Sequence, residues 1–375
     1  MAADKKQRKG DQDPEEFLLD SLYINPTRFC NLRCRHCWVS PSFKEDPAEK
    51  DDEMSMAEII DIVREARGLG LDSIKLTGGE PLLRKGIEEL LEFCAVSGVE
   101  VMIETNGTLV TKAVAGMFRK FKVSHVAVSL DSASEETHDL FRGQKGAFRR
   151  TLDGIRNLRD EYFSPQVIVS LYKENLTGFS RFIRLMQGLK VSDVKINTIS
   201  SIGRGGDMRD TGLIPSVAQV LAFSKELCKI SEGFQGSLFL DIPLAFKGLE
   251  EIKYRGCGVC SIKNILGILS DGSVSICGIG LVNDELIFGN VRGDPSLLNE
   301  IWRHDPVLKQ IREGIPSKLE GVCGICVFRN RCLGGCRAEV YHNTGSLFAP
   351  YSFCQEAFEK GLFPSTRLIP EALRT

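Results

Sequence analysis

The sequence lacks net charge and long apolar runs, and each absence excludes a class of protein. Lys and Arg total 48 against 50 Asp and Glu, which gives a formal net charge of −2 over 375 residues. This balance gives no general electrostatic reason to expect nucleic acid or an anionic membrane as a partner. No segment approaches the roughly 18 consecutive apolar residues of a membrane-spanning helix, and the N-terminus lacks the apolar centre of a signal peptide. We therefore expect a cytoplasmic protein.

Histidine is also scarce, whereas cysteine is abundant. With five histidines, no Ser-His-Asp set or paired carboxylates stand out as acid/base machinery. Thirteen cysteines are an odd number, so they cannot all form disulfides within one chain. Thiols stay reduced in the cytosol, and closely spaced cysteines there indicate metal or cluster ligation.

Short β-rich runs alternate with amphipathic helical stretches from Ser21 onward. The predicted strands cover 22–25, 73–76, 99–104, 125–130, 167–171 and 194–197. Helical periodicity covers 55–70, 87–95, 114–118, 148–158 and 179–186. This alternation predicts a parallel α/β sheet with right-handed crossovers. An open doubly wound sheet and a barrel both satisfy the pattern.

The pattern changes in the C-terminal part, where glycine and cysteine become dense. Segments 266–269 and 274–276 flank Asp271-Gly272, whose positive φ angles suit a tight hairpin turn. We divide the chain into these segments: a disordered tail at 1–20, a core domain at 21–225, a linker at 226–256, a cysteine-rich α+β domain at 257–360 and a C-terminal tail at 361–375.

The cysteines fall into sets by their surroundings. Cys94 and Cys228 lie among apolar residues at helical spacing and are predicted to pack in the core. Cys30, Cys34 and Cys37 follow the first strand within one loop, which can turn three thiolates toward one point. An all-cysteine zinc site needs a fourth ligand, whereas three ligands on a four-iron cluster leave one iron open to a small chelating molecule.

This loop resembles the CxxxCxxC signature of the radical S-adenosylmethionine (SAM) superfamily, including an aromatic residue, His36, before the last cysteine. The resemblance implies a partial (β/α)6 TIM-like barrel and a [4Fe-4S] cluster whose open iron binds SAM. It also implies reductive cleavage of SAM to a 5′-deoxyadenosyl radical that abstracts a substrate hydrogen. Flavodoxin or ferredoxin is the kind of reductant that it implies.

Further segments resemble the SAM pocket of that family. Gly78, Gly79 and Glu80 match the motif that binds the methionine amino group, and paired glycines let the backbone approach a ligand. Other candidates are Asn106, Ser129, Asp131 and Arg142, the last resembling an arginine that some relatives use against the SAM carboxylate. Strand-end turns, loop caps and an exposed helix-end arginine are the competing structural interpretations.

Eight further cysteines resemble the SPASM extension of radical SAM enzymes, with the pattern C-x11-G-x4-C, C-x2-C-x5-C-x3-C and a final C. The resemblance implies two auxiliary [4Fe-4S] clusters, three clusters in all. One would use Cys257, Cys260, Cys277 and Cys336, and the other Cys323, Cys326, Cys332 and Cys354. Two zinc sites are the alternative. The spacing of Cys257 from Cys260 departs from relatives, so the first auxiliary cluster could instead have an open iron.

SPASM relatives mostly modify peptides, and we expect a peptide substrate that is crosslinked or oxidised. Modification of a haem precursor is the main alternative. Sulfatase maturation is disfavoured, because those relatives carry a catalytic aspartate where this chain has Gly278. About 20 residues precede the first strand, so a leader peptide would be bound by a separate protein or by the barrel. An iron-sulfur electron carrier is the non-enzyme alternative, which the SAM-pocket segments argue against.

Overall fold

One ten-stranded sheet organises the chain. The computed structural model describes residues 17–39, 52–254, 260–278 and 283–371. The strands are β1 (Ser21–Ile24), β2 (Ser73–Leu76), β3 (Glu100–Thr105), β4 (His125–Ser129), β5 (Gln166–Leu171), β6 (Asp193–Thr198), β7 (Ser237–Asp241), β8 (Ile265–Ile268), β9 (Ser273–Ser275) and β10 (Ile287–Asn290). Their order is β10-β9-β8-β1-β2-β3-β4-β5-β6-β7.

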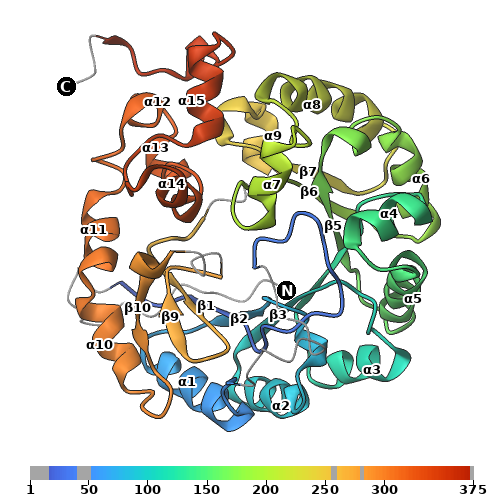
Figure 1. Cartoon of the computed structure of the whole chain (residues 1–375), viewed down its shortest axis with the longest axis vertical. Helices are drawn as coiled ribbons and strands as arrows, with labels where there is room; N and C mark the ends of the chain where they lie inside the picture. Colours follow the sequence, from blue (N-terminus) through green and yellow to red (C-terminus); the bar gives the residue numbers. More distant parts are fainter. Residues whose placement is uncertain (1–16, 40–51, 255–259, 279–282, 372–375) are drawn as a thin grey trace.

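Strands β1 to β7 run parallel in sequence order. The six predicted strands are confirmed, and the curved sheet with its outer helices is the expected partial barrel (Figure 1). A seventh strand, β7, lies within 226–256, and helix α8 (Val217–Ser231) crosses residue 225. This stretch therefore adds regular structure to the barrel, because Leu238 and Leu240 of β7 pack into its core.

The helices cover the outside of the sheet and extend into the C-terminal part. In the barrel they are α1 (Met56–Gly68), α2 (Ile87–Ser97), α3 (Lys112–Lys120), α4 (Glu135–Arg142), α5 (Ala147–Asp160), α6 (Phe179–Gly188), α7 (Arg204–Asp210), α8 and α9 (Leu249–Tyr254). Figure 1 shows α1 to α6 and α8 in an arc around the sheet. The segment after β1 lies at the centre of this arc, at the carboxyl ends of the strands, where barrel active sites form.

Helix α1 illustrates why the sequence pattern was informative. The Ser55 side chain accepts a hydrogen bond from the Glu58 amide, and the Glu58 side chain accepts one from the Ser55 amide, as a capping box predicts.

The two cysteines expected in the core differ in burial. Cys94 on α2 is fully buried in the core, as expected. The same expectation for Cys228 is wrong, since this residue is exposed. Helix α8 turns another face inward, which carries Val217, Val220, Phe223 and Leu227.

Residues alternate between the two faces of each barrel strand. In β2, for example, Ile74 and Leu76 are buried in the core beneath the outer helices, whereas Lys75 is only partly buried. The inner face carries Tyr23 of β1, Lys75 and Glu104, and on the far strands Lys195 and Asp241. Lys75 Nζ lies 2.5 Å from Glu104 Oε1, and Lys195 Nζ lies 3.2 Å from Asp241 Oδ2. The interior thus contains two ion pairs.

The C-terminal part joins the barrel through its sheet. Strands β8 and β9 form the predicted antiparallel hairpin, and β8 also pairs in parallel with β1. Its helices are α10 (Leu297–His304), α11 (Pro306–Gly314), α12 (Gly321–Gly324), α13 (Arg329–Cys332), α14 (Arg337–Thr344) and α15 (Ser352–Glu359). They enclose a second, smaller core that includes Cys277, Cys323, Cys326 and Cys354.

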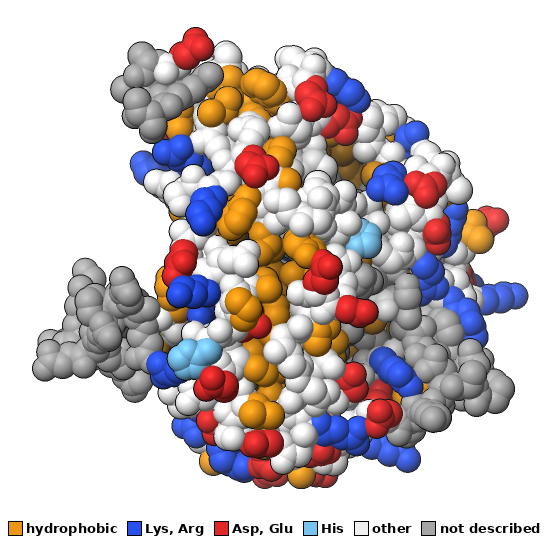
Figure 2. All heavy atoms as spheres, turned by 60° about the vertical axis from the view of Figure 1, so that its left-hand side comes forward, with side chains coloured by type: hydrophobic (Ala, Val, Ile, Leu, Met, Phe, Trp, Pro, Cys, Tyr) orange, Lys and Arg blue, Asp and Glu red, His pale blue; other side chains and the backbone are white. Residues whose placement is uncertain are grey.

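The surface agrees with the near balance of charges. On the face that Figure 2 shows, basic and acidic side chains are interspersed along the margins, and a band of hydrophobic side chains runs between them. Among the described residues, no helix has the length and apolarity needed to cross a membrane.

Candidate active site

The three N-terminal cysteines meet in the loop that follows β1. Cys34 packs with Leu32 and with Ala147 of α5, and Cys30 and Cys37 pack against the same small cluster. Burying Leu32 anchors the middle of the loop. The Cys30 thiol accepts a hydrogen bond from the Leu32 amide at 3.4 Å, so the backbone partly fixes this ligand candidate.

The environment of Cys30 and Cys34 opposes ionisation of their thiols when no metal is bound. Burial, followed by the charge of Glu80, raises the pKa of Cys30 to about 12. Burial also raises the pKa of Cys34, although Arg142 acts in the opposite direction. Thiolates gathered in this way need compensating positive charge, which a metal cluster supplies as its binding releases the protons. The donor set therefore fits a cluster.

The end of helix α4 holds one side of the loop. The amides of Arg33 and Arg35 donate to the carbonyls of Arg142 and Phe141, at 3.0 and 2.9 Å. Gly143 makes this close approach possible, since it has φ +67° and a Cβ there would lie 2.5 Å from the Arg33 carbonyl oxygen. The loop is thus docked through backbone contacts that depend little on side-chain identity.

Arg142 and Asp131 form a buried pair beside Cys34. Arg142 Nε donates to Asp131 Oδ2 at 2.6 Å, and its Nη1 lies 3.7 Å from Cys34 Sγ. The other Asp131 oxygen accepts from the Ser170 amide at 2.9 Å. Burial acts to raise the pKa of Asp131, but the charge and hydrogen bond of Arg142, together with the nearby His36 and His138, lower this pKa below its usual value. Arg142 is buried, so the exposed helix-end interpretation is wrong.

The glycine pair after β2 packs against the start of the cysteine loop. Gly78 has φ +102°, and a Cβ there would lie 2.7 Å from Asn25 Cγ. A Cβ on Gly79 would overlap the Phe29 carbonyl oxygen. The Glu80 amide donates to that oxygen at 2.8 Å. Glycine is therefore required at both positions by close backbone approach.

Glu80 itself is a buried clamp between β2 and β3. Its carboxylate accepts hydrogen bonds from Thr105 Oγ1 at 2.8 Å, the Asn106 amide at 2.8 Å and the Leu82 amide at 3.2 Å. Asn106 continues the connection, since its Nδ2 donates to Asn31 Oδ1 at 2.8 Å. These contacts tie the carboxyl ends of two strands to the cysteine loop. Ser129 lies at the end of β4, partly buried and opposite Ile168 of β5.

Several buried polar atoms at the mouth of the barrel have no hydrogen-bond partner within the described ranges. They are Asn25 Oδ1, His36 Nδ1, Tyr172 OH, Asn197 Oδ1 and two nitrogens of Arg204. His36 stacks on Phe141, with ring centroids 4.5 Å apart, and burial lowers its pKa to about 3, so the ring is neutral. Since buried polar groups normally have partners, this set of donors and acceptors fits a polar ligand at the mouth.

The C-terminal cysteines lie in two neighbouring sets. Cys260, Cys277 and Cys336 interact electrostatically with one another, and burial raises the pKa of Cys260 to about 12. Cys257, expected to join them, lies outside the described residues. Cys336 immediately precedes α14 and follows three cysteines of the second set in the sequence. The two sets therefore alternate along the chain, as the interleaved ligation requires.

The second set brings together Cys323, Cys326, Cys332 and Cys354. Cys323 and Cys354 share a hydrogen bond, which lowers the pKa of Cys323 and raises that of Cys354. Within the described ranges, no three His, Cys, Asp or Glu side chains lie close enough together to coordinate a single metal ion.

A fully buried arginine organises the backbone around these sets. Arg337 donates to the carbonyls of Leu347 at 3.1 Å and Ala349 at 2.8 Å, and also to that of Gly334. Its charge also interacts with Cys323, Cys336 and other thiols of both sets. It therefore supplies positive charge where thiolates gather.

Gly278 faces the N-terminal site. A Cβ at this position would lie 3.4 Å from the Trp38 ring, 3.5 Å from Thr77 Cγ2 and 3.8 Å from Tyr23 Cβ. The position after Cys277 thus lies where the cysteine loop, β1 and the glycine motif meet. Gly280, its companion in the sequence, lies outside the described residues.

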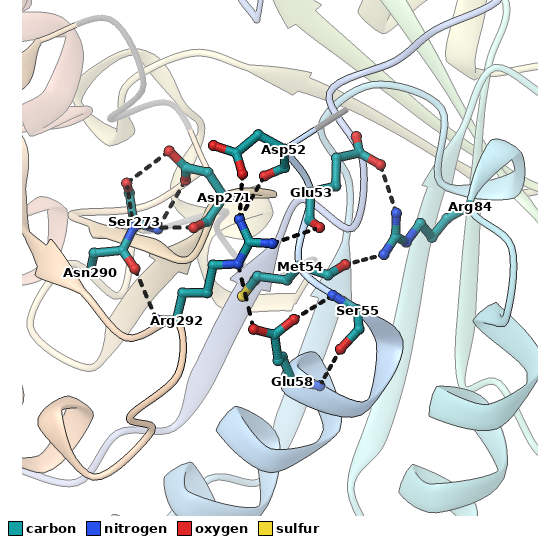
Figure 3. Close-up of polar contacts among 10 residues, drawn as sticks. All are labelled: Asp52, Glu53, Met54, Ser55, Glu58, Arg84, Asp271, Ser273, Asn290 and Arg292. Atoms are coloured by element: carbon teal, nitrogen blue, oxygen red, sulfur yellow. Dashed lines mark hydrogen bonds and ion pairs between the residues drawn. The ribbon is translucent and has the colours of Figure 1, made fainter. Parts of the chain in front are cut away.

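Sequence reasoning missed the connection between the two parts of the chain that Figure 3 shows. Glu53 Oε1 accepts from Thr27 Oγ1 at 2.6 Å and from the Arg28 amide at 2.8 Å. Arg84 Nη1 binds its other oxygen at 2.7 Å (Figure 3). Arg292, which follows β10, binds the adjacent Asp52 at 2.6 Å. Glu53 belongs to no motif, so only the three-dimensional structure identifies it.

Comparisons with known proteins agree with this geometry. The Radical SAM superfamily profile matches residues 24–186, and the SPASM iron-sulfur cluster-binding domain profile matches residues 257–327. An AdoMet-dependent heme synthase of Methanosarcina barkeri is 30% identical over 88% of this chain and 94% of its own length. Mycofactocin maturase MftC of Mycolicibacterium smegmatis is 27% identical over 92% and 85%.

Solved structures show the same fold. Streptococcus suis SuiB bound to its precursor peptide SuiA has a TM-score of 0.69 at 19% identity, covering 91% of this chain and 76% of SuiB. The sequence matches extend through both the barrel and the cysteine-rich part. The chain therefore belongs to the radical SAM superfamily and is an enzyme with a C-terminal SPASM domain.

Proposed function

We propose that this enzyme cleaves SAM reductively and abstracts a hydrogen atom from a peptide substrate. The observation that carries the proposal is the convergence of Cys30, Cys34 and Cys37 at a barrel mouth rich in unpartnered polar atoms. When bound there, a [4Fe-4S] cluster and SAM supply the 5′-deoxyadenosyl radical. The three cysteines hold the cluster in this proposal.

The other residues of the site orient the cofactor and exclude water. Gly78 and Gly79 bring the backbone close to SAM, and Glu80 and Asn106 hold that backbone in place. Asp131 orients Arg142 beside Cys34, where it would bind the SAM carboxylate, and Ser129 would line the nucleoside pocket. The stacked rings of His36, Phe141 and Tyr172 close one wall against water.

In the C-terminal domain we propose two auxiliary [4Fe-4S] clusters. Cys257, Cys260, Cys277 and Cys336 would hold the first, and Cys323, Cys326, Cys332 and Cys354 the second. The grouping of seven of these thiols into two neighbouring sets supports this assignment. Fully ligated clusters of this kind conduct electrons or organise the fold.

The peptide substrate is supported by the similarity to MftC, which is named a maturase. Modification of a tetrapyrrole side chain is the second candidate, supported by the 30% identity to a haem synthase over nearly its whole length. We further propose a cytoplasmic enzyme that receives electrons from flavodoxin or ferredoxin, since reduced thiols and a low-potential donor are both needed.

Anaerobic reconstitution tests the reaction. After iron and sulfide are restored, dithionite and SAM should yield 5′-deoxyadenosine and methionine, and about 12 iron atoms should bind per chain if three four-iron clusters form. Absence of 5′-deoxyadenosine would contradict the proposal. About four iron atoms with two zinc ions would contradict the auxiliary clusters.

Mass spectrometry of products separates the two substrate candidates. Precursor peptides encoded beside the enzyme and iron coproporphyrin should be incubated in parallel with the reconstituted enzyme. A mass change in a peptide alone supports maturation, and loss of carboxyl groups from the porphyrin alone supports the second candidate.

A further inference from the structure

Arg204 stands out among the polar groups at the barrel mouth because its guanidinium has no ion-pair partner among the described residues. Its Nε and Nη2 atoms are buried and have no hydrogen-bond partner within the described part of the chain. The lysines of the barrel interior differ, since Lys75 is paired with Glu104 and Lys195 with Asp241. An arginine stays charged at any physiological pH, so its buried nitrogens require an acceptor.

Backbone contacts fix Arg204 beside the cysteine loop. Its amide donates to the Cys37 carbonyl at 3.0 Å. The preceding Gly203 has φ +57°, and a Cβ there would lie 2.6 Å from the Trp38 carbonyl oxygen. Arg204 is therefore held against the end of the loop that carries Cys37.

The same segment contacts the C-terminal domain on its other side. Ser201 Oγ donates to Asn343 Oδ1 of α14 at 3.0 Å. Ser200 and Ser201 also lie close enough to Glu339 of the same helix to interact with its carboxyl group. Helix α14 begins directly after Cys336. Arg204 thus lies between the N-terminal cysteine site and the first auxiliary set. A substrate that reacts at one site and passes an electron toward the other has to occupy this region.

We propose that Arg204 binds a carboxylate of the substrate. The planar guanidinium pairs with a carboxylate through two parallel hydrogen bonds, which would satisfy the buried nitrogens. This inference rests on the proposed function, whose two candidate substrates share this chemistry. A peptide offers its C-terminus or acidic side chains, and a tetrapyrrole offers propionates. Arg142 is not the candidate for this role, because its Nε and Nη1 are paired with Asp131 and Cys34 and the proposed function assigns it to SAM.

Binding measurements on the reconstituted holoenzyme with SAM test the inference with two pairs of probes. One pair is iron coproporphyrin III and its tetramethyl ester, titrated by absorbance. The other is a pool of random octapeptides before and after methyl esterification, measured by affinity selection and mass spectrometry. Variants are Arg204→Gln and Arg204→Lys, and Arg209→Gln is the matched control, because Arg209 lies on the same helix with an exposed side chain.

In one of the two arms, the wild type should prefer the free acid by about tenfold or more, the effect of one charged hydrogen-bonded pair. Arg204→Gln should reduce the preference below about twofold, Arg204→Lys should retain part of it, and Arg209→Gln should retain it all. The arm that shows the preference identifies the source of the carboxylate. Circular dichroism and iron content verify folding, and Arg204→Lys carries the test if Arg204→Gln fails to fold.

A wild type without preference in both arms would overturn the inference, as would full preference in Arg204→Gln. The inference also fails if Arg204→Gln weakens SAM binding and leaves the preference intact, because Arg204 would then serve the cofactor. Formation of 5′-deoxyadenosine by the wild type in the same preparation tests the proposed function separately.

Discussion

The two cysteine-rich regions are built in opposite ways. Cys30, Cys34 and Cys37 come from one short loop that is docked on a barrel whose core contains none of them. The C-terminal cysteines come from distant segments and are themselves part of a small core. The first region is thus a site added to a stable scaffold, whereas in the second the site and the scaffold coincide. Loss of a ligand should therefore affect chemistry in the first region and stability in the second.

The largest expected effect is that of Cys34→Ala compared with Cys326→Ala. Cys34→Ala should lower 5′-deoxyadenosine formation by more than about 1,000-fold, because the cofactor carries the chemistry, and should leave the unfolding midpoint of the barrel nearly unchanged. Cys326→Ala should instead lose the second auxiliary cluster and destabilise its domain. Iron content, product analysis and thermal unfolding report these effects. Retained SAM cleavage in Cys34→Ala would refute the assignment.

Arg337→Met tests whether the C-terminal core depends on its buried charge. Three backbone carbonyls lose their donor, so the domain should be destabilised by about 3 kcal/mol. Both cores can be followed separately by amide hydrogen exchange, because each has its own buried helices, α2 in the large core and α14 in the small one. Protection should fall in α14 and stay unchanged in α2. Lys309→Met, at an exposed residue of α11, is the control.

Glu53→Gln tests how the start of the cysteine loop is held, next to the contact between the regions that Arg292 makes in Figure 3. Loss of the charge weakens the hydrogen bonds to Thr27, Arg28 and Arg84, so the cysteine loop should be held less firmly. Residues that orient ligands in this way typically contribute about 10-fold or more to activity. We expect a loss of about 10-fold in SAM cleavage with unchanged iron content. Glu88→Gln, at an exposed surface pair, should have no effect.

The smallest effects distinguish the two cysteines outside the clusters. Cys94→Ser places a hydroxyl in an apolar core and should cost about 1–2 kcal/mol of stability. Cys228→Ser changes an exposed position and should stay within about 0.5 kcal/mol. Chemical denaturation measures both. Equal effects would contradict the burial difference between these two residues.

The barrel was predictable because its strands and helices follow local periodicity, as the capping box at Ser55 shows. Strand β7 was missed because its apolar run, Leu238 to Leu240, is only three residues long and follows a glycine-containing stretch that is typical of a linker. Cys228 was misassigned because helical spacing identifies a periodic face only approximately. It is rotated by about 100° from the buried Leu227, which is enough to move it from the core to the surface. Arg204 and Glu53 depend on contacts between distant segments, which single-sequence patterns do not encode. Of these two residues, only Arg204 has a distinctive local sequence, since glycines flank it on both sides.

The parallel pairing of β1 with β8 has a consequence for biosynthesis. During translation the first strand emerges early, but its neighbour on that edge is made only after the rest of the barrel. Arg292, which secures the segment holding the cysteine loop, emerges later still. A nascent chain therefore displays an unpaired strand edge beside its first three cysteines. Insertion of the N-terminal cluster into a finished site must follow completion of the C-terminal hairpin, so cluster-loading factors would meet a nearly full-length chain.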